Sequence, residues 1–215
     1  MIKEKVKKSP LRALAGASIA ISVIAIAGQS VLATLNATTF NTQAQSVDSG
    51  TLKLNLTNAG DGFSQAISNL APGDVVNRYV TLTNTGTLDG IGLKLKADSS
   101  GTQTLISDSV GGSTNKAIKV TVTNCSQAWS GGICGGTSTT EISATALSAL
   151  STATPFANSS MNSGDVKYLQ IKLQLPDQNE LTTNGNAPAN SVQGGNITVT
   201  YNFDLAQRLP STSNS

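Results

Sequence analysis

The sequence predicts an all-β protein, a jelly-roll-like antiparallel β-sandwich with one short helix and long loops. Apolar and polar residues alternate with period two in six stretches, which places one side of each strand on a core and the other in water. Turn sequences such as Pro72-Gly73-Asp74 and Ser163-Gly164-Asp165 separate these stretches. Only 12% of the residues are charged and 4% are aromatic, so Thr, Ser, Asn and Gly supply the polarity, as is typical of a β-rich surface.

Residues 1–33 are predicted to be a secretory signal peptide. Basic residues open this segment, at Lys3, Lys5, Lys7, Lys8 and Arg12. A weakly apolar run, Ala13–Ala27, follows, and the small residues Val31 and Ala33 suit the pockets of a signal peptidase. We therefore expect cleavage between Ala33 and Thr34. The alternative is a retained membrane anchor, because an apolar run of about 15–20 residues approaches the length of a membrane span.

Cleavage would leave 182 of the 215 residues, which suits one domain, and would export them from the cell. The segment carries five basic residues and one acidic residue of the 14 and 12 in the whole chain, so 9 and 11 remain and the net charge becomes −2. No basic patch survives, and nucleic acid is therefore not an expected partner. No membrane partner is expected after cleavage.

The sandwich is predicted over residues 49–208. Its six strands are expected near Ser49–Leu56, Val75–Asn84, Gly90–Ala97, Ile118–Cys125, Val166–Leu175 and Asn196–Leu205. A short helix is expected over Ile142–Leu150, where Ile142, Ala146, Leu147 and Leu150 form one apolar stripe. Two long loops, Ser99–Lys116 and Pro176–Gln193, interrupt the strands, and the tail 209–215 is predicted to be disordered.

The two cysteines, Cys125 and Cys134, are predicted to form a disulfide. Export places them where disulfides persist, and the intervening residues include two glycines that allow the chain to turn back. Such a small closed loop is worth roughly 2–3 kcal/mol in the chain-entropy model. Two free thiols or a metal-binding pair are the alternatives, but the chain has no histidine and no second cysteine pair to complete a zinc site.

Several blocks of this sequence resemble TasA-type biofilm fibre proteins and their camelysin relatives. The blocks are Ala33-Thr34-Leu35-Asn36, Ser49-Gly50-Thr51-Leu52-Lys53-Leu54, Leu70-Ala71-Pro72-Gly73-Asp74, Tyr79–Gly86, Ile91–Lys96, and Asn190–Gly194 with Ile197–Phe203. The resemblance extends over roughly residues 33–97 and 190–207. It implies an exported jelly-roll subunit, cut by a dedicated signal peptidase, that polymerises with copies of itself into extracellular fibres.

The resemblance further implies that the N-terminal segment released by cleavage, within residues 34–48, fills a groove of the next subunit as an added strand. Thr34–Gln45 is uncharged and rich in small residues, with Leu35, Ala37 and Phe40 as the expected anchors. Such a segment can pair its backbone with an exposed sheet edge, and a head-to-tail contact of this kind propagates a filament. The alternatives are that the segment pairs within its own domain or remains a linker.

No enzymatic activity, metal or cofactor is expected. The camelysin name implies a secreted peptidase. The chain has no histidine, however, so neither a His-Glu-x-x-His zinc helix nor a Ser-His-Asp triad can form. Ser113-Thr114-Asn115-Lys116 has the spacing of a Ser-Lys dyad, yet it lies in a Gly-rich loop rather than on a helix. Asp177, Asn179 and Glu180 could bind calcium through oxygen ligands, although their spacing matches no known calcium loop, and a solvated acidic loop is the alternative.

Two function classes follow. The first is a structural fibre subunit, secreted to an extracellular matrix or the cell surface, where other matrix or surface proteins could be further partners. The second is a monomeric, secreted, adhesin-like binding module. A fibre subunit should form high-mass assemblies once Thr34 is the N-terminus, whereas a binding module should stay monomeric with or without residues 34–45.

Overall fold

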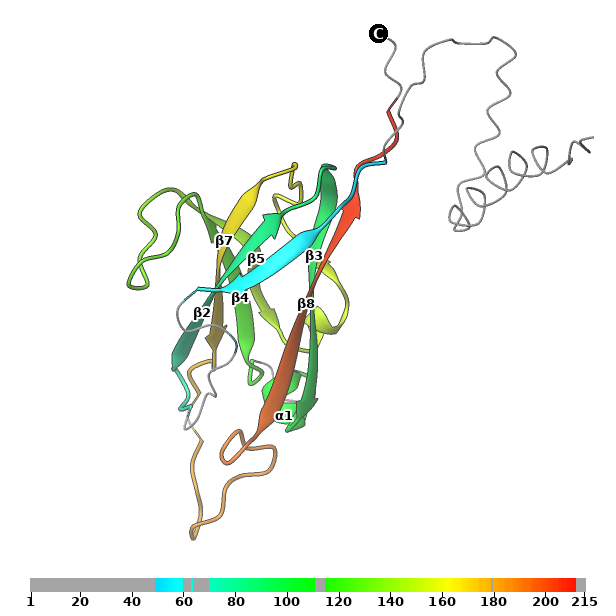
Figure 1. The fold of residues 1–215 in the computed structure, drawn as a ribbon. Coiled ribbons are helices and arrows are strands. Elements are labelled where there is room, and N and C mark those ends of the chain that lie inside the picture. Colours follow the sequence, from blue (N-terminus) through cyan, green and yellow to red (C-terminus); the bar gives the residue numbers. More distant parts are fainter. Residues whose placement is uncertain (1–48, 60–62, 64–69, 111–114, 179, 212–215) are drawn as a thin grey trace, which may run out of the picture. The chain divides into compact units, whose positions relative to one another are not determined.

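The computed structural model describes residues 49–59, 63, 70–110, 115–178 and 180–211 (Figure 1). All of them belong to one unit, which spans Asp48–Ser215. The strands are β1 (Leu54–Asn58), β2 (Val75–Asn84), β3 (Gly90–Gly101), β4 (Lys119–Cys125), β5 (Ser138–Ala146), β6 (Thr154–Pro155), β7 (Val166–Gln174) and β8 (Ile197–Gln207). The described residues also form the short helix α1 (Gln103–Ile106) and the 3-10 turn η2 (Ala149–Ser151).

The strands form two antiparallel sheets, which confirms the predicted all-β sandwich. The five-stranded sheet has the order β1-β2-β7-β4-β5, and the three-stranded sheet has the order β6-β3-β8. In Figure 1, β3 and β8 run side by side, and their register joins Leu95 to Phe203 and Ala97 to Tyr201. Most pairings join strands that are distant in the sequence, so the fold depends on contacts that no local pattern specifies.

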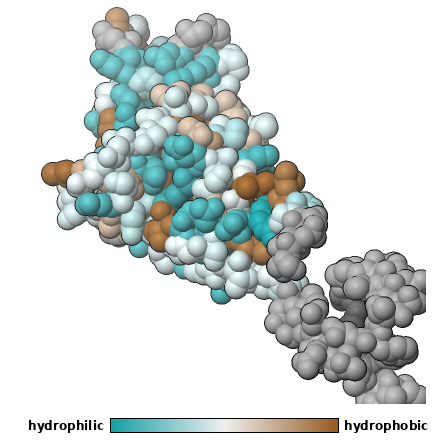
Figure 2. All heavy atoms as spheres, turned by 90° about the horizontal axis from the view of Figure 1, so that it is seen from above, coloured by the Kyte–Doolittle hydropathy of each residue, from teal (hydrophilic) through white to brown (hydrophobic). Residues whose placement is uncertain are grey.

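The core lies between the sheets, where the apolar residues at every second position of the strands meet. Its fully or almost fully buried side chains include Val80, Leu82, Leu93, Leu95, Val120, Val122, Leu169 and Ile171. On the outside, the face seen in Figure 2 carries small groups of hydrophobic side chains separated by hydrophilic ones. Burial of the alternating apolar set therefore follows the period-two pattern of the sequence.

All six predicted strands are present, with shifted ends. β1 begins at Leu54 rather than Ser49, because Thr51 and Lys53 use their carbonyl oxygens to bind the turn at Thr85–Leu88 instead of a neighbouring strand. β3 continues to Gly101, and α1 follows directly, so the predicted loop Ser99–Lys116 is wrong at its start. The second predicted loop, Pro176–Gln193, contains no helix or named strand in its described residues.

The helix predicted over Ile142–Leu150 is wrong. Ser138–Ala146 forms β5, which pairs with β4, and a 3-10 turn follows. The pairing shifts register twice near Val122, so two consecutive residues, Glu141 and Ile142, are both buried. These irregularities hide the period of two that identified the other strands. Leu147 and Leu150 still reach the core, from the turn that follows the strand.

Candidate functional site

In the part of the chain that the structure describes, one side of the sandwich is open. The other side is closed by the chain itself, because the short connection through η2 joins β5, the edge of the larger sheet, to β6, the edge of the smaller one. This leaves β1 and β8 as the remaining edges, and in the described part of the chain β8 pairs only with β3. Along its other side, β8 thus pairs with no described strand, and an edge of this kind can accept an added strand.

The inward-facing side chains of β8 are only partly covered. They are Ile197, Val199, Tyr201, Phe203 and Leu205, and all five pack against the core while remaining half-buried. On the neighbouring strand β3, by contrast, Leu93, Leu95 and Ala97 are fully buried. In β1, the edge strand of the larger sheet, Leu56 is 39% exposed although it pairs with the fully buried Leu82 of β2. Among the described residues, the apolar side chains on this side of the core are thus covered less completely than those of β3.

A cavity of about 790 Å³ lies beneath the first half of β8. Its apolar wall is formed by Leu105, Ile118, Leu173, Leu175, Ile197 and Val199, with Phe63 and Leu70 from the segment between β1 and β2. The ring of Phe63 stacks on that of Tyr201, with centroids 4.8 Å apart. Strands β2, β7 and β8 and the glycine turn Gln193–Gly195 meet at this cavity, although they lie far apart in the sequence.

Four polar side chains line the cavity, those of Arg78 from β2, Tyr201 from β8, and Gln193 and Asn196 from the turn before β8. Arg78 is only 9% exposed, and its Nη1 donates to the carbonyl oxygen of Asn77 at 3.5 Å, in addition to other interactions. Burial raises the pKa of the Tyr201 hydroxyl, and the positive charge of Arg78 offsets part of that rise. The hydroxyl is therefore a neutral hydrogen-bond donor at physiological pH.

The long loop before β8 is held at the cavity by a buried carboxylate. Glu180 accepts hydrogen bonds from the Lys116 ammonium, at 3.0 Å, from the Ser191 hydroxyl and from the Val192 backbone N–H. Burial by itself raises the pKa of Glu180, but the hydrogen bonds from Ser191, Lys116 and Val192 and the charge of Lys116 outweigh it, so the pKa is lowered. Asp108 also has a lowered pKa because, although burial raises it, its contacts with Lys119 and the Ala117 N–H dominate.

Replacing Glu180 with glutamine is expected to lower the free energy of unfolding at pH 7 by about 1–3 kcal/mol, since hydrogen bonds to a charged group are lost. Because the pKa of Glu180 is lower in the folded protein than in the unfolded chain, its charged form stabilises the fold at pH values above the unfolded pKa. This stabilisation is lost as the pH falls through the folded pKa and the carboxylate becomes protonated. The stability difference between wild type and Glu180→Gln should thus shrink on acidification below about pH 4.5. Urea unfolding from pH 7 to pH 3 measures it, and a difference independent of pH would contradict this role.

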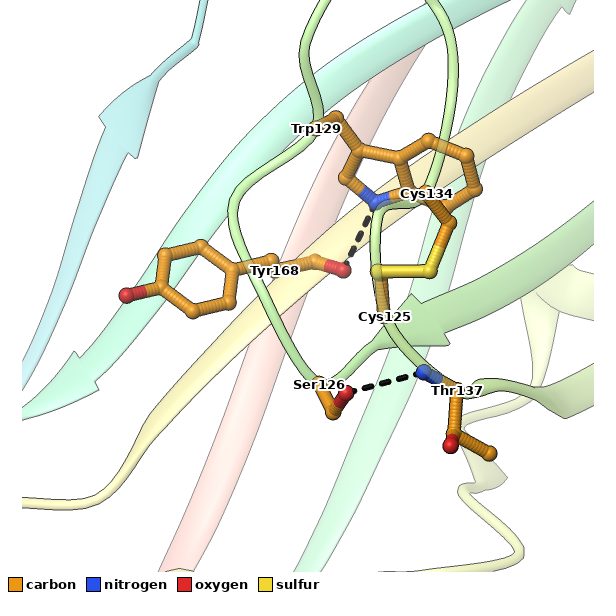
Figure 3. The surroundings of a disulfide bond; sticks show 6 residues. All are labelled: Cys125, Ser126, Trp129, Cys134, Thr137 and Tyr168. Carbon is orange, nitrogen blue, oxygen red and sulfur yellow. Dashed lines mark hydrogen bonds between the residues drawn. A yellow bond between two sulfur atoms is a disulfide. The ribbon is translucent and has the colours of Figure 1, made fainter.

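The cysteines form the predicted disulfide and hold the loop between β4 and β5 on the outer face of the larger sheet (Figure 3). Trp129 in this loop donates its indole N–H to the carbonyl oxygen of Tyr168, at 2.9 Å, and its ring lies 5.5 Å from that of Tyr79. At the neck of the loop, Ser126 Oγ accepts from the Thr137 N–H at 2.9 Å. This cluster fixes the loop but lies away from the cavity, because none of its residues lines it.

A buried ion pair was missed by the sequence analysis. Lys167 Nζ of β7 lies 3.2 Å from Glu141 Oε1 of β5, and the side chains are 10% and 0% exposed. The sequence could have indicated that Lys167 is buried, since it lies an even number of residues before Leu169, Ile171 and Leu173 and therefore shares their core-facing side of β7. Arg78 likewise lies on the same side of β2 as Val80 and Leu82. A charged residue at a core-facing position indicates a buried polar contact.

The predicted cleavage residues Ala33 and Thr34 and the predicted anchors Leu35, Ala37 and Phe40 lie outside the described residues. Ser113 of the Ser-Lys spacing does as well, whereas Lys116 is bound to Glu180 and to the carbonyl oxygen of Asn190. Across the ranges that the structure describes, no helix has the length and hydropathy needed to cross a membrane.

Most of the chain matches a known protein family. The family model of camelysin metallo-endopeptidases matches residues 5–212. The chain belongs to the camelysin family. This confirms the resemblance to the camelysin and TasA-type proteins, and it supports a secreted, matrix-associated protein. No curated protein matches the chain.

The family description implies a metal, but the donor set of this camelysin-family chain does not fit one. The sequence contains no histidine, and both cysteines are joined in the disulfide. Within the described ranges, no three His, Cys, Asp or Glu side chains come together in a group that could hold a metal ion. Of the candidate calcium ligands, Glu180 is engaged by Lys116, Ser191 and Val192, and Asn179 lies outside the described residues. We derive no catalytic step from these residues.

Proposed function

We propose that this chain is a non-enzymatic structural subunit of extracellular fibres, and that it polymerises by donating its N-terminal segment to the next copy. The observation that carries the proposal is the open edge of β8, whose inward-facing apolar side chains are half-buried beside a cavity of about 790 Å³. An added strand would pair with this edge and would cover those side chains. The other partner would be the signal peptidase that frees the segment.

The proposed donor, Thr34–Gln45, has the composition that such a strand requires. It lacks charge, so burial of its backbone would not place an ion in the core. In an extended strand Leu35 and Ala37 point to one face and Phe40 to the other, so one of these two sets can enter the cavity in a given register. Each copy gives one segment and receives another, so the contact does not close on itself and the assembly grows as a filament.

The test is deletion of Thr34–Ala44 from the secreted protein. We expect the shortened chain to keep its β-sheet circular dichroism spectrum but to sediment as a monomer, because the proposed donor is absent while β1–β8 remain. The mature protein, with Thr34 as its N-terminus, should form filaments visible by electron microscopy. A synthetic peptide of residues 34–45 should bind the shortened chain and not the polymer, in which the edges of β8 are already occupied.

Filaments from the shortened chain would show that residues 34–44 are not the donor. A mature protein that stays monomeric at every concentration would instead favour the adhesin-like binding module.

A further inference from the structure

The cavity beneath β8 contains a polar group that the fold does not satisfy. The hydroxyl oxygen of Tyr201 is buried and makes no hydrogen bond within the structure described. Buried hydroxyl groups without a partner are uncommon because they lose their hydrogen bonds to water on folding. An unpaired donor on the lining of a cavity therefore indicates that a ligand with an acceptor atom completes the site.

The charge at the cavity restricts the chemistry of that ligand. Arg78 lines the same space and is 9% exposed, so its positive charge is largely removed from water. A negatively charged ligand would interact favourably with this buried positive charge. A carboxylate fits both groups, because its charge is opposite to that of the guanidinium and its oxygens can accept a hydrogen bond from the phenol.

Much of the rest of the lining is apolar, although the side chains of Gln193 and Asn196 also line the cavity. The apolar part comprises Leu105, Ile118, Leu173, Leu175, Ile197 and Val199, together with Phe63 and Leu70. The volume of about 790 Å³ lies in the range of small-molecule sites, which is about 300–1,000 Å³. A buried charged group together with a large apolar wall matches an amphiphile rather than a sugar or a nucleotide.

We propose that this cavity binds a free single-chain carboxylate amphiphile of the fatty-acid class, with its carboxylate at Arg78 and Tyr201 and its hydrocarbon chain along the apolar wall. Binding does not require polymerisation. If the fibre function holds, the amphiphile and the donated strand cover the same side chains of β8, Ile197 and Val199, and occupancy of the cavity would slow assembly.

The first test is calorimetric titration of the monomeric fraction of the purified protein with decanoate, below the concentration at which it forms micelles. Decan-1-ol, which has the same chain without the charge, and acetate, which has the charge without the chain, are the matched ligands. We expect saturable binding of one decanoate per chain and at least ten-fold weaker binding of the other two. Absence of decanoate binding, or equal binding of decan-1-ol, would overturn the proposal.

The second test removes one atom. Tyr201→Phe is expected to weaken decanoate binding about ten-fold, because a hydrogen bond to a charged group is lost. Its melting temperature should not fall, since the hydroxyl makes no hydrogen bond in the unliganded chain. Tyr168→Phe is the control, because this residue lies by the disulfide loop and not at the cavity, and it should bind as the wild type does. Equal affinities of wild type and Tyr201→Phe would show that the hydroxyl does not meet the ligand.

Discussion

Replacing Glu141 with alanine is expected to lower the free energy of unfolding by about 3–5 kcal/mol. The substitution removes the partner of Lys167, whose ammonium would remain buried with an uncompensated charge. It also removes the acceptor of the Asn158 backbone N–H, which donates to Glu141 Oε2 at 2.7 Å. Equilibrium unfolding in urea at pH 7 measures the loss, with the slope of the transition used to check that the unfolding remains two-state.

The exposed pair Lys96–Asp98 provides the matched control. Its side chains are 40% and 52% exposed, so Asp98→Ala should cost less than about 1 kcal/mol. A double variant, Glu141→Leu with Lys167→Met, should recover much of the stability that Glu141→Ala loses, because it removes both charges and fills the space. If Glu141→Ala were no more harmful than Asp98→Ala, the ion pair would not be acting as a buried one.

Removing the disulfide, by Cys125→Ser with Cys134→Ser, is expected to lower the free energy of unfolding by about 2–3 kcal/mol. The bond joins residues nine apart, so its absence gives the unfolded chain the extra freedom of a small loop. The loop also carries Trp129 onto Tyr79 and Tyr168, and loosening it should shift the tryptophan fluorescence towards that of an exposed indole. Urea unfolding followed by fluorescence measures both effects.

Chemical reduction of the wild type supplies the comparison for this variant. The reduced wild type and the double serine variant should unfold at the same urea concentration, because both lack the cross-link. Deletion of Thr34–Ala44 serves as a second reference, since it leaves the disulfide in place and should not change the response to reduction. An oxidised and a reduced wild type with the same midpoint would show that the bond contributes nothing to stability.

The period-two pattern predicted most of this fold because strand alternation is a local property. In β7, for example, Leu169, Ile171 and Leu173 face the core as their spacing predicts. The second half of β5 was predicted as a helix because its irregular pairing leaves the consecutive residues Glu141 and Ile142 both buried and breaks that spacing. Bulges arise from the pairing of two strands, so the sequence of β5 alone does not reveal them.

The candidate site was less predictable than the strands. Its lining comes from β2, β7, β8, the residues around α1 and the turn before β8, which are brought together only by the order of strands in the sheets. The sequence could have marked Arg78 and Lys167 as charged residues at core-facing positions. It could not show that Arg78 meets a cavity while Lys167 meets Glu141, because these outcomes depend on the opposing sheet and on the neighbouring strand.

By itself, the sequence determined the all-β class, six of the strands with their apolar faces, and the proximity of Cys125 to Cys134. These features depend on residues that are close together along the chain. Only the tertiary structure decided that β8 is left as an edge above a cavity and that Glu141 is buried against Lys167. The reason is physical: which strand lies at an edge is set by the pairing of distant segments, and no short stretch of sequence contains that pairing.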